Sequence, residues 1–230
     1  MTTSAGVVNI VFTDRSDGDL RPLPAAVGDG HVDRDHPHLT EVAGRRQAIT
    51  PEPWTWLRQI HGGRTVFVSH PGELAGVAAD AAVTVTPGCP LSVTTADCAP
   101  VVLIAEGGVA VIHAGWRGLV ADIVATSASQ LRAVAGAPVA AILGPCINAA
   151  AYEFGAEALA LAVAGLGPTV EARTGWGTPA LDVPAAVAVA CERAGWPPPT
   201  DPAPCTSDQR WYSHRTRADE SRQAAVAWLG

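Results

Sequence analysis

Short apolar runs rich in β-branched residues, each bounded by Gly, Pro or polar residues, recur along the chain and predict strands. Seven such runs are predicted to form strands, at 7–12, 65–68, 81–86, 91–95, 100–104, 109–113 and 139–143. Helical spacing of apolar residues predicts helices at 41–49, 119–134, 155–164, 184–194 and 219–229. This alternation indicates an α+β or mixed α/β fold, and the length of 230 residues favours a single domain over residues 1–230.

The strands PVVLI and VAVIH flank a Gly-rich turn and predict a β-hairpin whose open end carries Cys98 and His113. With Gly107-Gly108 as the two-residue loop, Val102 is expected to face His113. Pro100 lacks the N–H that a ladder hydrogen bond needs. The chain is therefore expected to leave the sheet at this proline and to fold the Cys98 thiol back toward the imidazole.

The bulk composition indicates a globular protein with a sizeable core, and it argues against binding to nucleic acid. The net charge is −7 and no basic stripe with interleaved aromatic residues occurs, which argues against a nucleic-acid surface. The N-terminal residues lack the basic and apolar regions of a signal peptide, and no apolar run of about 18 residues predicts a membrane span. We therefore expect a cytoplasmic protein that binds neither nucleic acid nor membrane.

The cysteines and arginines further limit which catalytic and anion-binding groups the chain can use. The five cysteines are scattered and odd in number, which favours buried thiols with one ligand or nucleophile over a disulfide framework. All 15 basic residues are Arg, so a Schiff-base lysine, a P-loop lysine and a Ser-Lys dyad are excluded. An anion must then be held by Arg, backbone amides or a metal ion. Arg117 is one candidate because it precedes the predicted helix 119–134, where free amides favour anions; an ordinary solvent-facing Arg is the alternative.

His61, Cys98 and His113 form the best set of soft metal ligands, because each lies at the edge of a predicted strand beside Gly or Pro. One thiolate and two imidazoles favour Zn²⁺ over hard cations, and three protein ligands leave a fourth position open for chemistry. Two alternatives stay open: a Cys-His pair in which Cys98 is the nucleophile, and three unrelated core residues. The histidines of the polar 16–40 segment are interpreted as solvated side chains; they are His31, His36 and His38.

Several short motifs follow one another in an order typical of one protein family. They are QIHG at 59–62, DAAVTVTPG at 80–88, TADCAPV at 95–101, HAGWRG at 113–118, GPCI at 144–147, YE at 152–153, LDV at 181–183, CT at 205–206 and SHR at 213–215. Together they resemble the YfiH/laccase-domain family, also called the polyphenol oxidase or purine nucleoside phosphorylase family. The likeness runs from about Val7 to Leu229, and TADC with HAGWRG carries it most specifically.

The resemblance implies a single-domain α+β enzyme of mixed β-sheets with helices packed outside, and a zinc ion held by His61, Cys98 and His113. It also implies phosphorolysis of purine nucleosides (adenosine, inosine, guanosine and methylthioadenosine) together with deamination of adenosine. The chain departs from the family pattern in a shortened segment after the first strand and at Gly44, Ala150-Ala151 and Thr216. These departures bear on substrate contacts more than on the metal ligands.

The leading hypothesis is a zinc-dependent purine nucleoside phosphorylase with adenosine deaminase activity. Zinc lowers the pKa of a bound water to about 7, and the resulting hydroxide would attack the adenine C6 carbon. The predicted catalytic residues are Cys98, His61, His113 and Asp97. Asp97 is expected to orient a ligand or act as an acid or base, with the capping of a turn as the alternative. The predicted residues for substrate and phosphate are Arg45, Arg117, Arg215 and His214.

Three rival functions stay open on the sequence. A peptidoglycan-editing amidase, acting on a UDP-linked muropeptide, would keep the metal and change the substrate. A copper-dependent polyphenol oxidase is less favoured, because multicopper sites need more histidines than the seven present. A binding protein with a structural zinc would unfold when the metal is removed, whereas a catalytic site would mainly lose turnover.

Overall fold

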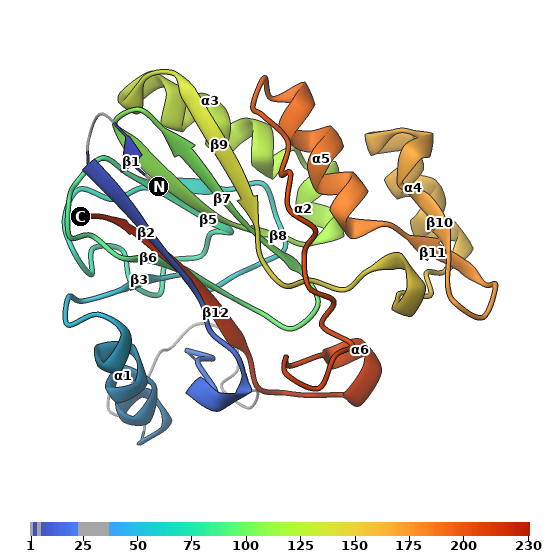
Figure 1. The fold of residues 1–230 in the computed structure, drawn as a ribbon, viewed down its shortest axis with the longest axis horizontal. Coiled ribbons are helices and arrows are strands. Elements are labelled where there is room, and N and C mark those ends of the chain that lie inside the picture. Colours follow the sequence, from blue (N-terminus) through green and yellow to red (C-terminus); the bar gives the residue numbers. More distant parts are fainter. Residues whose placement is uncertain (1, 4–5, 23–36) are drawn as a thin grey trace.

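A computed structural model of the chain describes residues 2–3, 6–22 and 37–230. Two five-stranded mixed sheets pack face to face (Figure 1). The first sheet has the order β1 (Thr2–Thr3), β2 (Gly6–Phe12), β12 (Gln223–Leu229), β6 (Leu91–Thr95) and β3 (Thr55–Trp56). The second has the order β4 (Thr65–Phe67), β5 (Ala81–Thr84), β8 (Gly108–Ala114), β7 (Ala99–Ala105) and β9 (Pro138–Leu143).

Alternating side chains of the strands build a core on each face of the second sheet. Val102 and Val111 point into the layer between the sheets, whereas Leu103 and Ile112 point to the opposite face. That opposite face is covered by helices α2 (Trp116–Val120), α3 (Ile123–Ala135) and α5 (Val183–Arg193). The prediction of mixed sheets with helices packed outside is therefore confirmed, since period-two burial leaves both faces of the sheet apolar.

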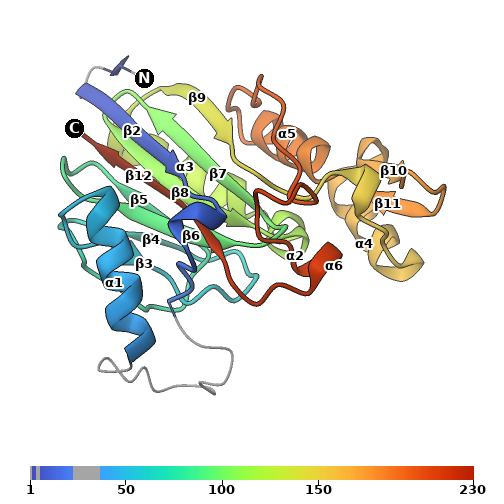
Figure 2. The same ribbon diagram turned by 60° about the horizontal axis from the view of Figure 1, so that its bottom comes forward.

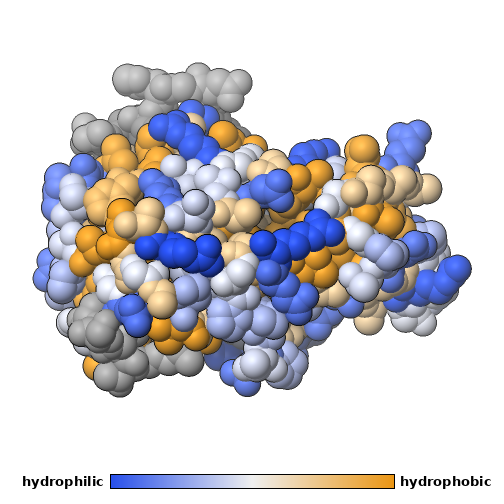
Figure 3. Space-filling view, turned by 90° about the horizontal axis from the view of Figure 1, so that it is seen from above, coloured by the Kyte–Doolittle hydropathy of each residue, from blue (hydrophilic) through white to orange (hydrophobic). Residues whose placement is uncertain are grey.

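The two ends of the molecule carry smaller elements. Helix α1 (Pro37–Ile49) lies on the side of the first sheet, where Trp54 and Val226 belong to a third apolar cluster. Helix α4 (Ala156–Leu166) and the hairpin of β10 (Glu171–Arg173) and β11 (Pro179–Leu181) extend at the opposite end (Figure 2). Hydrophobic residues reach the surface on the side where α4 lies, and Leu161 of this helix is 60% exposed (Figure 3).

The predicted hairpin is present, but its register is shifted by two residues. Ala105 pairs with Gly108, so Glu106-Gly107 forms the turn, and Pro100 rather than Val102 lies opposite His113. Gly108 is the first residue of β8, and a Cβ there would lie 2.7 Å from the Cβ of Ala135 and 2.8 Å from a backbone oxygen, so the strand has room only for glycine at this position. The expectation that the chain leaves the sheet at Pro100 is wrong, since this residue is the second of β7 and its carbonyl accepts a hydrogen bond from the N–H of Gly144.

Two of the predicted helices are corrected by the structure. Residues 219–229 do not form a helix; Gln223–Leu229 is the central strand β12 of the first sheet. Its apolar residues are buried on both faces, so the period-two signal of a half-exposed strand is missing. The predicted helix 119–134 is two helices, because Asp122 adopts a left-handed φ of 56° between α2 and α3. As a result Arg117 lies inside α2 and not before a helix.

Every helix among the residues that the structure describes is too short or too polar to cross a lipid bilayer.

Candidate functional site

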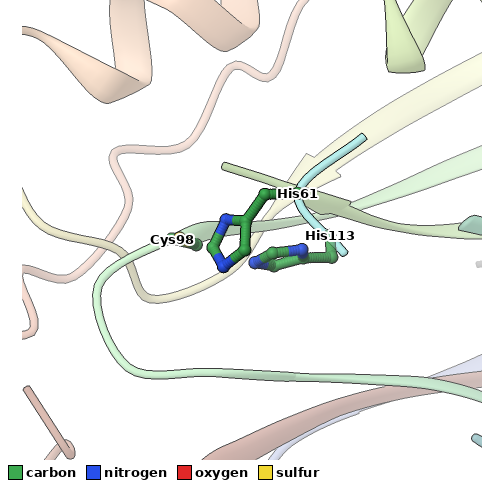
Figure 4. Close-up of side chains that lie close together, drawn as sticks. All are labelled: His61, Cys98 and His113. Atoms are coloured by element: carbon green, nitrogen blue, oxygen red, sulfur yellow. The ribbon is translucent and has the colours of Figure 1, made fainter. Parts of the chain in front are cut away.

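The three predicted metal ligands come from separate segments that meet at one end of the second sheet. His113 lies near the end of β8, Cys98 directly precedes β7, and His61 lies in the loop between β3 and β4. Their ligand atoms all lie within 4.8 Å of one another, and the two imidazole rings meet edge to face at 4.7 Å between centroids. Figure 4 shows the imidazole rings of His61 and His113 close together, with Cys98 beside them. The corrected hairpin register explains this proximity, because it brings Cys98 two residues closer to His113.

Asp80, the residue before β5, holds two of the three ligands in place. Its carboxylate is fully buried and accepts a hydrogen bond from Nδ1 of His113 at 2.8 Å. It also accepts the backbone N–H groups of Ile60, His61 and Gly62, the last two at 2.9 and 2.8 Å. With the Nδ1 proton directed at the carboxylate, Nε2 of His113 is the nitrogen free for a metal ion.

The backbone conformation of the loop that carries His61 is fixed by the same carboxylate. His61 has a left-handed φ of 54°, which is uncommon for a residue other than glycine. Such strain persists where surrounding interactions hold it, and it concentrates at functional sites. The hydrogen bonds to Asp80 provide that support, so the imidazole of His61 is positioned before any ligand binds.

Gly115 leaves the space that the trio occupies. A Cβ at this residue would lie 2.8 Å from Nδ1 of His61 and 3.3 Å from Sγ of Cys98. Its backbone φ of −69° is open to any residue, so space and not conformation requires glycine. The first glycine of the HAGWRG motif thus serves the packing of the three ligand side chains.

The trio is strongly coupled electrostatically. Burial alone would raise the pKa of the Cys98 thiol, but His113 and His61 outweigh burial and lower the pKa to about 6. Burial alone would lower the pKa of His113, but the Cys98 thiolate and the Asp80 carboxylate raise it to about 9. A thiolate is the form of cysteine that binds metals and acts as a nucleophile. The site therefore supplies that form at neutral pH.

The carboxylate of Asp97 is occupied by hydrogen bonds from the opposite wall. It accepts the hydroxyls of Thr206 and Ser213 at 2.7 and 2.6 Å, and the backbone N–H of Arg215 at 2.6 Å. Asp97 itself has a left-handed φ of 95°. Its carboxylate thus fixes the turn before Cys98 and ties it to the segment that carries Arg215. This placement corresponds to the turn-capping alternative rather than to an acid or base.

The trio lines a cleft of about 470 Å³ together with several cationic side chains. Of the predicted substrate-binding residues, His214 and Arg215 line this cleft. Arg45 instead donates to the carbonyl oxygen of Asp19 from α1, and Arg117 stacks over the ring of Trp116 at 4.5 Å. Neither Arg45 nor Arg117 is part of the cleft lining, so their positions do not support the expected phosphate contacts.

The sequence interpretation missed several residues of the cleft. Asp80 was part of a quoted motif, but nothing in the sequence marked it as the partner of His113. Gln59 clamps β6, because its side-chain amide exchanges hydrogen bonds with the backbone of Thr94 at 2.8 Å. The remaining missed residues with charge or aromatic character are Arg21, Arg58, Tyr152 and Arg222. Residues separated by up to 201 positions converge here, and only the fold reveals that.

Apart from His214, the other histidines and cysteines that the structure describes do not line the cleft. Nε2 of His38, in α1, lies 2.6 Å from the carbonyl oxygen of Arg21, while His31 and His36 are outside the described residues. Burial raises the pKa of the Cys146 and Cys191 thiols, so neither supplies a thiolate. Within the described part of the chain, the trio is the one group of three or more His, Cys, Asp or Glu side chains close enough to hold a metal ion.

Comparison with known proteins agrees with this architecture. The family model described as multi-copper polyphenol oxidoreductase laccase matches residues 10–230. The chain belongs to this family. A Streptomyces coelicolor protein named purine nucleoside phosphorylase is 35% identical over 232 residues, which cover 95% of this chain and 94% of the relative.

Solved structures show the same fold. A Neisseria meningitidis protein of the DUF152 family superimposes with a TM-score of 0.78 at 26% identity, covering 100% of this chain and 98% of that one. The Bacillus licheniformis protein YfiH gives a TM-score of 0.78 at 22% identity, covering 97% and 93%. The resemblance to the YfiH/laccase-domain family is therefore confirmed.

Proposed function

We propose that the chain is a zinc-dependent purine nucleoside phosphorylase that also deaminates adenosine. One observation carries the proposal: a His-Cys-His trio, with one imidazole oriented by a buried carboxylate, lines a cleft together with four arginines. The relatives that are named purine nucleoside phosphorylase support a nucleoside as the substrate. Among the residues that the structure describes there is one such trio, which favours this function over multicopper oxidation, because the latter needs several metal sites.

The donor set fits zinc. His61, Cys98 and His113 would be its ligands, and three protein ligands with an adjoining cleft match the open arrangement of catalytic zinc sites. A zinc ion bound there would supply a Lewis acid and a hydroxide nucleophile near neutral pH, which is the chemistry that deamination needs. The Asp80 carboxylate would hold His113 in the ligating tautomer throughout.

Arg58 is the arginine of the cleft that is best placed to bind phosphate. The guanidinium of Arg58 makes no hydrogen bond or ion pair with any residue that the structure describes, and Arg215 lies with its guanidinium 4.9 Å from the ring centroid of Tyr152. The other two arginines of the cleft, Arg21 and Arg222, are engaged with carboxylates and backbone carbonyls. Guanidinium groups suit phosphate because they donate two parallel hydrogen bonds.

In phosphorolysis an oxygen of phosphate forms a bond to the ribose C1′ as the bond from C1′ to the purine nitrogen breaks. The departing purine takes up a proton. His214 is our candidate proton donor, because it is exposed and lines the same cleft as the trio. Burial and the neighbouring Cys98 raise the pKa of Tyr152 to about 12. Its hydroxyl therefore stays protonated and able to donate a hydrogen bond to the purine.

Turnover of inosine with and without phosphate tests the proposal. We expect hypoxanthine and ribose 1-phosphate from metal-loaded protein, release that depends on phosphate, and ammonia from adenosine. Cys98→Ser should abolish these activities, whereas Cys205→Ser, a cysteine outside the cleft, should retain them. Release of serine from a UDP-linked muropeptide, without hypoxanthine release, would instead establish the amidase.

A second pair of variants tests the phosphate assignment. Arg58→Ala should raise the KM for phosphate by about tenfold or more, since charge-assisted contacts contribute roughly 1.5–3 kcal/mol. Arg64→Ala removes a nearby exposed arginine that does not line the cleft, and it should leave this KM unchanged. Equal effects of the two substitutions would refute the assignment of Arg58.

A further inference from the structure

A second cleft of about 470 Å³ adjoins the metal-site cleft. Arg215 lines both clefts, and Tyr152, which it stacks on, is the neighbour in sequence of Glu153 in the second one. The second cleft, here called the side cleft, is lined by Ala151, Glu153, Gly155, Trp176, Arg215 and Thr216. Because the two clefts share Arg215, an extended ligand of the metal-site cleft is the candidate occupant of the side cleft.

Trp176 forms one wall of the side cleft and is 61% exposed. It lies at the tip of the β10–β11 hairpin, which is anchored to the wall opposite. The N–H of Gly175 donates to the carbonyl of Ala150 at 2.9 Å, and the indole Nε1 donates to a carboxylate oxygen of Glu153 at 3.1 Å. A large aromatic ring that is both exposed and held in place is a feature of binding sites.

The charges of the side cleft are opposite in sign and unpaired. No ion pair joins Glu153 or Arg215 to any other residue in the described ranges. Glu153 retains a second carboxylate oxygen beyond the one that binds the indole. The small residues Ala151 and Gly155 leave room between these groups, and a Cβ at Gly155 would meet no atom within 4 Å.

We propose that the side cleft binds an α-amino-acid group at the end of an extended purine nucleoside. The ammonium group of such a ligand would lie against the indole of Trp176 and the carboxylate of Glu153, while its carboxylate would pair with Arg215. The substrate class is then a purine nucleoside with an extended substituent that ends in both charges. This inference rests on the proposed function, because it names the substrate class of the same site.

Two ligands that differ only beyond the thioether test the inference by titration calorimetry on metal-loaded protein. S-adenosylhomocysteine carries the amino-acid end, and methylthioadenosine lacks it. We expect S-adenosylhomocysteine to bind about tenfold more tightly, since partly exposed charge pairs and cation–π contacts are individually modest. Glu153→Gln and Trp176→Ala should each reduce the ratio of the two dissociation constants, methylthioadenosine over S-adenosylhomocysteine, to less than about threefold.

Glu157→Gln is the matched control, because Glu157 is an exposed carboxylate just beyond the side cleft and should leave the ratio unchanged. Thermal unfolding of each variant shows whether it is folded. Equal affinities of the two ligands for wild-type protein, or a ratio that both variants leave intact, would overturn the inference. If methylthioadenosine is turned over in that case, the proposed function still stands. If the ratio behaves as expected but no nucleoside is turned over, the inference stands and the proposed reaction is wrong.

Discussion

Replacing Gly115 by alanine would place one methyl group against the proposed metal ligands. The new Cβ would lie 2.8 Å from Nδ1 of His61, whereas an ordinary contact begins at 3.4 Å. The backbone angles of Gly115, φ −69° and ψ 156°, suit alanine, so the substitution adds volume without backbone strain. The perturbation therefore acts on the ligand positions and not on the local fold.

The size of the effect follows from the tolerance of metal sites. The ring of His61 must retreat by about 0.6 Å, from 2.8 to 3.4 Å, while ligand distances in metal sites are held within about 0.2 Å. Substitutions that misplace a ligand through its surroundings reduce metal affinity by about 10- to 100-fold. We expect Gly115→Ala to weaken zinc binding by at least that much, and to reduce turnover accordingly.

Gly155→Ala provides a closely matched control for this substitution. Both glycines are helix N-caps without a side-chain cap, and their backbone angles agree within about 15°. The Cβ of Gly155 meets no atom within 4 Å. Competition with a chromophoric chelator measures zinc affinity, and calorimetry of the metal-free proteins measures stability. Equal zinc affinities of the two variants would refute the idea that Gly115 makes room for the trio.

Three further predictions concern charge. Asp80→Asn should destabilise the protein by about 2–4 kcal/mol in denaturant unfolding, because it weakens a buried acceptor of several hydrogen bonds; a loss below 0.5 kcal/mol would contradict the role of Asp80. In metal-free protein, the rate of Cys98 alkylation should rise with pH as the thiolate forms, with a midpoint near pH 6. His113→Ala should move that midpoint to higher pH, and bound zinc should protect the thiol from alkylation. For Asp219, hydrogen bonds and charge from Ser213 and two arginines outweigh burial and lower its pKa below 3.8. The stabilisation it provides is complete above that ordinary pKa and is lost as the pH falls through the lowered value, so Asp219→Asn should flatten the acid limb of stability against pH.

The local chemistry of the sequence predicted much of the site. His61, Cys98 and His113 stood out because each is a soft ligand at a predicted strand edge near Gly or Pro, and the structure brings them together. The strand Leu91–Thr95 was predicted to the residue, since its alternating pattern and flanking turns are strong local signals. Signals of this kind depend on neighbours in the sequence and do not require the fold.

Features that depend on distant packing were not predictable in the same way. The strand Gln223–Leu229 is alanine-rich and buried on both faces, so its sequence resembles a helix until its packing against the second sheet on one face and against Trp54 on the other is known. The hairpin register places Gly108 against Ala135, which is 27 residues further along the chain and is not apparent from the turn sequence. Likewise, Arg58 was not distinguishable from Arg45 by sequence alone. Arg58 lines the cleft and Arg45 contacts Asp19, and only the fold shows these different positions.

Zinc K-edge X-ray absorption of the purified protein shows whether His61, Cys98 and His113 hold an open zinc site. We expect one zinc per chain with one sulfur ligand at about 2.3 Å and two imidazole nitrogens at about 2.0–2.1 Å, plus an exchangeable oxygen. The sulfur scattering should disappear in Cys98→Ser. A zinc shell without sulfur, or one with four protein ligands, would contradict the proposed open site.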